Sequence, residues 1–215
     1  MKIAVAGGTG FVGTELIKSL NENYETVSIS RGESEEADIS VKADVTNKEE
    51  YVDELQEAEV AYYLVHGMAS KGDLTEIERN CAEEFRDACT EAEVDRVIYL
   101  TGMEHEEEVS EHMDTRSMTG DILSKGKYDF TEIGSAIIMG WKSSSFQLLY
   151  QLSSRLPLMI TPKWLENKVQ PIHISDVVHY LEKCLEVEET RNKYLEIGGP
   201  ETLTYAELLK KVGKQ

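Results

Sequence analysis

The sequence predicts a doubly wound α/β fold, in which helices cover both faces of a mostly parallel sheet. An apolar run at residues 2–6 breaks into a glycine-rich turn and continues as an amphipathic helical pattern over residues 14–20. Strand-like and helix-like segments then alternate along the chain, an order that selects an open parallel sheet with right-handed crossovers. The run at residues 59–65 is almost continuously apolar, as expected of a strand buried on both faces.

The later elements follow from the same periodicities. A serine among residues 143–145 should cap a helix that starts near Phe146. His173 falls in a strand and His179 on a helix, where structural roles account for both. We expect further strands at residues 25–31, 41–45 and 96–102, a sixth strand within residues 128–140 with its apolar core at 136–139, and helices at residues 47–58, 74–92, 111–125, 146–156 and 205–214.

The composition is that of one globular domain. The chain has 215 residues, 40% of them apolar, and no Pro-, Gly- or Ser-rich linker divides it, so we predict a single domain over residues 1–215. No apolar run reaches the length of a membrane span, and a cytoplasmic protein is expected. Cys81, Cys89 and Cys184 are too few and too scattered for disulfides or a metal centre, so buried thiols and no metal are expected.

The charge balance limits the class of partner. The chain carries 41 acidic and 22 basic residues, a formal net charge of -19. Because binding to a polyanion needs clustered Lys and Arg, this balance disfavours nucleic acid and anionic membranes. A small-molecule partner is compatible with this net charge, and so is self-association into a homo-oligomer.

The turn after the first strand reads Gly7-x-x-Gly10-x-x-Gly13. Such a turn brings backbone N–H groups and the positive end of a helix dipole to one point, where a side chain at Gly7 or Gly10 would keep a pyrophosphate away. In doubly wound sheets the first strand-to-helix turn is where a dinucleotide binds. The pattern therefore indicates dinucleotide binding, and a tight structural turn without a ligand is the alternative.

Arg31 lies at the carboxyl end of the second strand. At this position an acid holds the ribose 2′-OH of NAD, or an arginine holds the 2′-phosphate of NADP. Neither Ser30 nor Gly32 beside it is acidic, which favours NADP, with NAD as the alternative. The glutamates within residues 33–36 would oppose the phosphate if they faced it, and an ordinary surface arginine is the other interpretation.

These features occur together in a known family. Over essentially its whole length the chain resembles an atypical, extended-type short-chain dehydrogenase/reductase of the NmrA-like kind. The resemblance is carried, in colinear order, by Gly7–Gly13, Asp44-Val45, Tyr62–Met68, Asn80, Tyr99–Gly102, Ser110–Arg116, Arg155–Pro157, Thr161–Trp164, Gln170–Val177 and Ile197–Pro200.

The resemblance implies a Rossmann sheet that binds NAD(P), with a small C-terminal substrate lobe formed by residues 141–170 and 198–215. Thr101 would lie near the nicotinamide and is a candidate catalytic residue, together with His112 and Arg116 on the following helix. By the same likeness the cofactor contacts fall on Gly7, Thr9, Gly10, Phe11, Val12, Gly13, Arg31, Asp44, Val45, Val65, His66 and Asn80.

The sequence departs from the family at the catalytic pair. Family dehydrogenases use Tyr-x-x-x-Lys, in which the ammonium lowers the pKa of the phenol so that it exchanges a proton with the substrate. None of the ten tyrosines here has a lysine four residues on, and the corresponding helix offers His112-x-x-x-Arg116 instead. Gly134 also stands where relatives often have an arginine in the sixth strand.

Two functions fit these residues. The first is an NADP-dependent reductase or epimerase acting on a small carbonyl or sugar-like substrate, which Thr101 and His112 would orient. The second is a non-catalytic NADP(H)-binding module, a redox sensor or an assembly partner, as some NmrA-like relatives are. Consumption of NADPH with a carbonyl substrate would distinguish the two.

Overall fold

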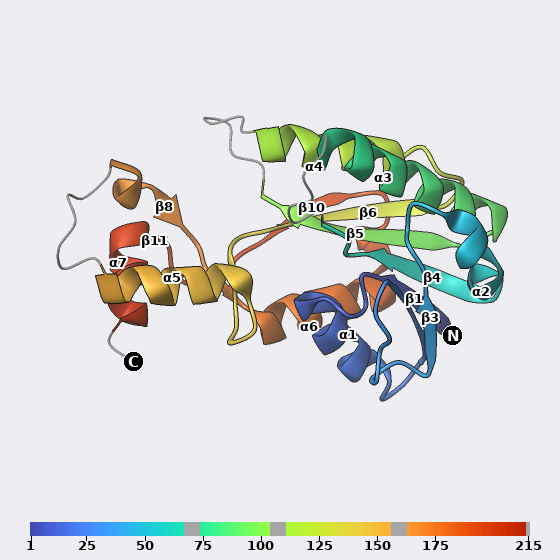
Figure 1. Cartoon of the computed structure of the whole chain (residues 1–215), viewed down its shortest axis with the longest axis horizontal. Helices are drawn as coiled ribbons and strands as arrows, with labels where there is room; N and C mark the ends of the chain where they lie inside the picture. Colours follow the sequence, from blue (N-terminus) through green and yellow to red (C-terminus); the bar gives the residue numbers. More distant parts are fainter. Residues whose placement is uncertain (67–73, 104–110, 156–162, 214–215) are drawn as a thin grey trace.

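The computed structural model of the protein describes residues 1–66, 74–103, 111–155 and 163–213. At its centre is a seven-stranded sheet in the order β10-β6-β5-β4-β1-β2-β3, and every neighbouring pair is parallel (Figure 1). Its strands are β1 (Lys2–Ala6), β2 (Glu25–Ser30), β3 (Ile39–Lys42), β4 (Ala58–Tyr63), β5 (Arg96–Gly102), β6 (Asp129–Ser135) and β10 (Tyr194–Ile197). The strand order reverses between β1 and β4, so the predicted doubly wound fold is confirmed.

Helices cover both faces of this sheet (Figure 1). Alternate residues of each strand enter opposite cores, because successive side chains of a strand point to opposite faces. Ile3 and Val5 of β1 pack with one set of helices, and Ala4 and Ala6 with the other. The helices are α1 (Phe11–Leu20) and α6 (Ile174–Glu186) on one face, and α2 (Val52–Leu55), α3 (Leu74–Glu91) and α4 (Glu111–Leu123) on the other.

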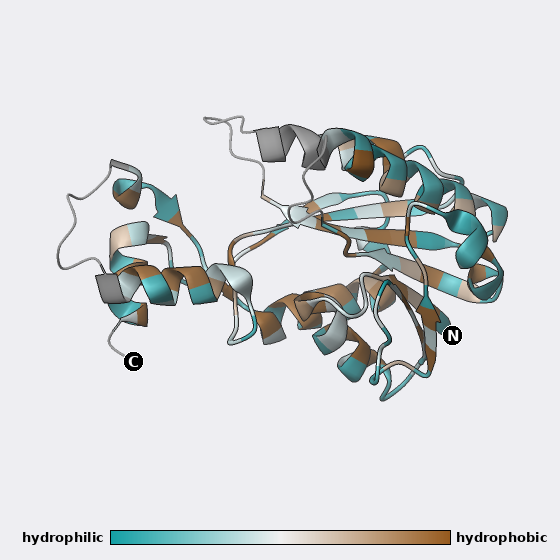
Figure 2. Cartoon of the chain, in the orientation of Figure 1, coloured by the Kyte–Doolittle hydropathy of each residue, from teal (hydrophilic) through white to brown (hydrophobic). Residues whose placement is uncertain are grey.

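Apolar residues gather in the central strands and along α6, whereas the outer surface of α3 is largely hydrophilic (Figure 2). The two cores explain the continuous apolar run that identified β4, since Val60 and Tyr62 lie in one core and Ala61 and Tyr63 in the other.

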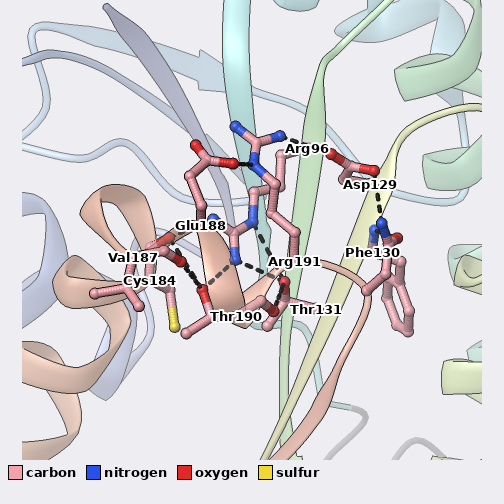
Figure 3. A network of polar contacts seen from close by, with 10 residues as sticks. Arg96, Asp129, Phe130, Thr131, Cys184, Val187, Glu188, Thr190 and Arg191 are labelled. Carbon is pink, nitrogen blue, oxygen red and sulfur yellow. Dashed lines mark hydrogen bonds and ion pairs between the residues drawn. The ribbon is translucent and has the colours of Figure 1, made fainter.

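A buried arginine joins α6 to the sheet. Arg96, the first residue of β5, is 1% exposed. Its guanidinium donates to the hydroxyls of Thr131 in β6 (2.8 Å) and Thr190 (2.7 Å), and to the carbonyl of Cys184 in the last turn of α6 (Figure 3). Because the carbonyl end of a helix carries partial negative charge, a cation there stabilises the helix. Arg96 thereby fixes the end of α6 against β5 and β6.

The remaining elements form a lobe outside the main sheet (Figure 1). In it β8 (Lys168–Val169) pairs antiparallel with β11 (Leu203–Thr204). The short parallel pair of β7 (Ile138–Met139) and β9 (Ile172–His173) joins the lobe to the main sheet, because Ile138 and Ile172 pack in the core with α1 and α6 whereas Met139 packs on the lobe core. Two helices, α5 (Ser144–Arg155) and α7 (Tyr205–Val212), and the 3-10 helix η3 (Lys163–Glu166) complete it. They enclose a third core of Leu149, Leu165, Leu208, Leu209 and Val212.

The sixth strand differs from its prediction. The apolar residues 136–139 were expected at its centre, but β6 is Asp129–Ser135, and residues 138–139 form the separate strand β7. The apolar pattern of the true strand is weak. Thr131 can take a buried position because its hydroxyl is hydrogen-bonded to Arg96 and to the Thr190 carbonyl, and Gly134 contributes no side chain. These residues interrupt the apolar pattern, so the sequence did not locate the strand correctly.

The stretch between β2 and β4 also differs. The third strand was expected at residues 41–45 and ends at Lys42, because Asp44 begins a turn with Thr46. The helix expected over residues 47–58 is only the 3-10 helix η1 (Lys48–Glu50) and the single turn α2. Tyr51 separates them with φ -145°, and its buried hydroxyl donates to the Val45 carbonyl at 3.1 Å.

Helix caps agree with the sequence. The hydroxyl of Ser143 accepts from the N–H of Phe146 (3.4 Å), so a serine does cap α5. His173 ends β9 and caps α6, its Nδ1 accepting from the N–H of Ser175 (3.2 Å). In the described ranges, no helix has both the length and the apolar character needed to cross a membrane.

Candidate functional site

The glycine turn between β1 and α1 is tied to the carboxyl end of β2. The N–H of Gly7 donates to the Ile29 carbonyl and the N–H of Gly10 to the Gly7 carbonyl, both at 2.9 Å. The N–H of Thr9 donates to the Ser30 hydroxyl at 3.2 Å. These bonds hold the turn at the edge where the parallel strands end, which is where doubly wound sheets bind ligands.

The surroundings that a side chain would meet differ among the three glycines of the pattern. Gly7 has φ +86°, and a Cβ there would lie 2.9 Å from the Leu64 carbonyl oxygen. A Cβ at Gly13 would lie 2.3 Å from the Gly7 carbonyl oxygen, so packing of α1 on the turn requires that glycine. Among the described residues, a Cβ at Gly10 would meet a single atom within 4 Å, the Gly7 carbonyl oxygen at 3.0 Å. The fold needs Gly7 and Gly13, whereas Gly10 borders open space.

The start of α1 is suited to an anion. Gly10 is its N-cap, no side chain caps the helix, and its first turn contains no acid. The first N–H groups of a helix have no intrahelical acceptor and lie at the positive end of its dipole. A pyrophosphate would therefore fit here against the backbone of Phe11, Val12 and Gly13. The half-buried ring of Phe11 packs on Gly140, where a Cβ would lie 2.4 Å from Cζ.

Arg31 borders the same turn. It is exposed and directly follows β2, and a Cβ on its neighbour Gly32 would lie 3.9 Å from the side chain of Thr9. Thr9 is also exposed. The structure thus brings Thr9 and Arg31 to one rim, next to the open side of Gly10.

Asp44 is held by a residue that the sequence analysis missed. Its Oδ1 accepts from the N–H (3.0 Å) and the hydroxyl (2.8 Å) of Thr46, and these two bonds, with a weaker effect of the Arg31 charge, lower the pKa of Asp44. The Thr46 carbonyl accepts from the amide of Asn80 at 3.4 Å. The Asp-x-Thr spacing, typical of a side-chain-to-backbone turn, was the available signal.

Two apolar residues of the expected contact set face inward. The side chain of Val45 is buried in the core beneath α2 and α3, so only its backbone borders this edge. Val65 is half-buried against the same core. His66 after it is exposed, with its ring centroid 6.4 Å from that of Tyr99.

Thr101 lies near the end of β5, 5% exposed, opposite Gly134 in the β5–β6 register. A Cβ at Gly134 would lie 2.5 Å from the hydroxyl of Tyr194, which donates to Glu196 at 3.0 Å. Tyr194 therefore occupies the space that a side chain at Gly134 would need. Sequence reasoning did not find Tyr194, because it belongs to a strand distant in sequence.

The other catalytic candidates are not placed. His112 and Arg116 belong to α4, but their side chains are outside the part of the chain that the structure describes. The motif residues Gly67, Met68 and Ser110 also fall outside it, as does the range 156–162. Among the described residues, no group of three His, Cys, Asp or Glu is arranged to hold a metal.

Together, an open cradle of backbone N–H groups at the switch point of a doubly wound sheet and a carboxylate fixed beside it define a dinucleotide-binding Rossmann protein. The family model for NAD(P)H binding matches residues 7–135, more than half of the chain. The chain therefore belongs to this NAD(P)H-binding family, in agreement with the resemblance to atypical short-chain dehydrogenases/reductases.

Solved structures with the same fold include nucleotide-sugar enzymes. The UDP-N-acetylglucosamine 4-epimerase of Bacillus cereus superposes with a TM-score of 0.81 at 16% identity, covering 100% of this chain and 81% of its own. The UDP-glucose 4-epimerase of Thermus thermophilus in complex with NAD has a TM-score of 0.79 at 15% identity, covering 100% and 83%. At such low identity the likeness concerns the fold alone.

One curated relative is a subunit of a larger enzyme. The mitochondrial NADH-ubiquinone oxidoreductase 40 kDa subunit of Neurospora crassa is 23% identical over 225 residues. The match covers 98% of this chain and 59% of the subunit, so the chain spans little more than half of that relative.

Proposed function

We propose that the protein is an NADP(H)-dependent reductase or epimerase acting on a small carbonyl or sugar-like substrate. The observation that carries the cofactor part is the open space at Gly10, in front of an uncapped helix start with no acid in its first turn. A pyrophosphate would accept from those N–H groups, and the dipole of α1 would stabilise its charge. When bound, the nicotinamide ring would supply the hydride chemistry.

The preference for NADP rests on Arg31. It is the residue that follows β2, it is exposed, and it shares a rim with Thr9. A guanidinium forms charge-assisted and often bidentate hydrogen bonds to a phosphate. Its hydrogen bond to the uncharged 2′-OH of NAD would be weaker. Asp44 would take the adenine side, oriented by Thr46 and adjoining Asn80.

The substrate would lie between the strand ends and the lobe of residues 141–170 and 198–215. Thr101 is the candidate to orient a substrate oxygen by its hydroxyl. His112 and Arg116, four residues apart on α4, are the further candidates that the family resemblance supplies. In this arrangement a histidine would take the orienting task that a tyrosine has in family dehydrogenases.

A non-catalytic NADP(H)-binding module is the second candidate. It is favoured by the missing Tyr-x-x-x-Lys pair and by the relative that is named as one subunit of an assembly. In this case the cofactor would stabilise the fold or report redox state, and Thr101 would only pack near it.

Two measurements test the proposal in sequence. Mass spectrometry of the nucleotide that co-purifies with the protein identifies the cofactor, and absence of any dinucleotide, with no thermal shift on adding NADPH or NADH, would refute the cofactor part. A screen of carbonyl compounds and sugar nucleotides, followed by NADPH absorbance and by product analysis for epimers, then tests turnover. Binding without turnover across the screen would favour the non-catalytic module.

A further inference from the structure

The side chain of Phe11 reaches from the glycine turn to the lobe. Phe11 is the first residue of α1, so its N–H is one of the donors proposed for the pyrophosphate. Its half-buried ring lies on Gly140, where a Cβ would come within 2.4 Å of Cζ and 3.2 Å of Cε2. Packed atoms do not approach as closely as 2.4 Å, so the ring leaves no room for a side chain at residue 140.

Space, and not backbone conformation, requires a glycine at residue 140. Among the described glycines a positive φ occurs at Gly7 alone, so the backbone of Gly140 is one that other residues adopt. The neighbours of its absent Cβ are side chains, since Cγ2 of Ile174 in α6 would also lie 3.2 Å away. Gly140 therefore lies between the first residues of two helices, α1 and α6, and the closer of the two is Phe11.

The lobe begins directly after Gly140. The Gly140 carbonyl accepts from the N–H of Ser143 at 2.9 Å. The hydroxyl of Ser143, 5% exposed, donates to the Ile138 carbonyl in β7 (2.9 Å) and accepts from the N–H of Phe146 in the first turn of α5. From there α5 leads away from the main sheet into the lobe (Figure 1). The first turn of α5 is thus tied to the segment on which the Phe11 ring lies.

The chain passes between the main sheet and the lobe again at residues 170–171 and 198–199, and these two segments are tied to each other. The N–H of Gly199 donates to the Gln170 carbonyl at 3.4 Å, and the Gln170 amide donates to the Gly199 carbonyl. A Cβ at Gly199 would lie 2.0 Å from the Pro171 carbonyl oxygen, so the two backbones are in close contact. The segment at Gly140, in contrast, is packed on the glycine turn.

We propose that Phe11 is a positioning residue, which couples occupation of the cofactor turn to the position of the lobe. The inference rests on the proposed function, because it takes the start of α1 as the pyrophosphate site and the lobe as the substrate side. A phosphate oxygen bonded to the N–H of Phe11 would restrict that residue, and its ring would then hold Gly140 and the first turn of α5. Cofactor binding would thereby prepare the lobe for the substrate.

Hydrogen exchange of the full chain, followed by mass spectrometry with NADP⁺ as the probe, tests the coupling. Amides exchange through local openings, and a ligand slows those openings that disrupt its site. Saturating NADP⁺ should slow exchange in the glycine turn, and also in residues 141–150 by about fivefold or more. Protection of the turn alone would overturn the coupling and leave the proposed cofactor site standing. Absence of NADP⁺ binding would refute the proposed function and the coupling with it.

Phe11→Ala removes the ring but keeps every backbone N–H of the turn. NADP⁺ should therefore still protect the glycine turn, whereas its protection of residues 141–150 should be lost. Val12→Ala changes the next half-buried residue of α1 and is the matched control, in which both regions should stay protected. If residues 141–150 remain protected in Phe11→Ala, or lose protection equally in Val12→Ala, the ring does not carry the coupling.

Gly140→Ala tests the same contact from the lobe, without the cofactor. Its Cβ would overlap the Phe11 ring, so we expect it to lower the Tm of the parent by about 3 °C or more. In a Phe11→Ala background the ring is gone and the neighbouring Ile174 remains, so the loss should fall to about 1 °C or less. Equal losses in the two backgrounds would show that residue 140 and the ring do not interact, which would overturn the proposal.

Discussion

The guanidinium of Arg96 and the hydroxyl of Thr190 lie 2.7 Å apart, although 94 residues separate them in the sequence. The same guanidinium also bonds Thr131 and the Cys184 carbonyl (Figure 3). Each of these partners is neutral, so the buried charge is stabilised directly by hydroxyl dipoles and by the carbonyl end of α6, and the charge of Glu188 adds a smaller attraction. The amino end of β5 therefore holds α6, which packs on α1 behind the glycine turn.

Arg96→Met should lower the free energy of unfolding by about 3 kcal/mol or more, because it leaves several buried acceptors and hydroxyls without a donor. Urea unfolding measures this loss. Arg86→Met is the control: its guanidinium pairs with Asp87 at the surface of α3, and the change should stay within about 0.5 kcal/mol. Similar losses for the two variants would show that Arg96 contributes no more than a surface arginine.

Gly10→Val should abolish NADPH binding and leave the protein folded. The added side chain would fill the open space in which a pyrophosphate must approach the backbone, and in the described part of the chain its Cβ would come close to the Gly7 carbonyl oxygen alone. Circular dichroism reports the fold and the thermal shift with NADPH reports binding. Gly13→Val is the contrasting variant and should unfold, because its Cβ would overlap the turn itself. A Gly10→Val protein that still binds NADPH would remove the pyrophosphate from this place.

The elements around the glycine turn could be predicted because local rules and tertiary structure agree there. A buried parallel strand needs a continuous apolar run, and β4 and β5 have one. Where side-chain partners come from distant segments, the sequence pattern failed. In β6, the strand position of Thr131 depends on Arg96, and Gly134 depends on Tyr194, and neither relationship is visible within one stretch of sequence.

The candidate site shows the same limit. The glycine spacing located the turn, but it did not separate Gly10 from Gly13, because the distinction lies in what each absent Cβ would touch. The sequence did not identify Thr46 as a site residue, because its hydroxyl donates a hydrogen bond to Asp44 and does not match a known ligand-binding motif.

The carboxyl of Asp44 should titrate below the ordinary range for aspartate, and Thr46→Val should raise its pKa. The variant removes the hydrogen bond from the Thr46 hydroxyl but keeps the one from its backbone N–H, which is the larger cause of the lowered pKa. The pKa of Asp44 should therefore rise only part of the way to its ordinary value. A carboxyl with a lowered pKa in the folded state adds stability above about pH 4, and this is lost as pH falls through the folded-state value. NMR titration of the Asp44 carboxyl carbon measures the shift. Thr46→Ser, which retains a hydroxyl, should leave it unchanged, and an unchanged pKa in Thr46→Val would contradict this account.

Arg31→Ala should weaken NADP(H) binding by about tenfold to a hundredfold, since it removes the charge-assisted bonds to the 2′-phosphate. Binding of NAD(H), which lacks that phosphate, should change little, so the variant loses its preference between the two cofactors. Calorimetric titration of each cofactor into parent and variant gives the four affinities. Arg86→Ala serves as the charge-matched control, because it removes one arginine from the outer part of α3. If Arg31→Ala weakened both cofactors alike, the arginine would act through general attraction and not through the phosphate.

His112→Ala should reduce turnover by about a hundredfold or more while NADPH affinity stays nearly constant, as expected when a positioned acid-base group is lost. His112 and Arg116 are four residues apart on α4, so they lie on the same side of that helix, and Thr101 is the next-to-last residue of the neighbouring strand β5. A histidine that only packs near the cofactor predicts the opposite pattern, a change in stability or in cofactor affinity with no effect on the chemical step. Single-turnover measurement of NADPH oxidation with a substrate found by the carbonyl screen separates the two, because it reports the chemical step apart from binding. His179→Ala, on the exposed side of α6, should leave both quantities unchanged. Full activity of His112→Ala would assign orientation of the substrate to Thr101 and to residues other than this helix pair.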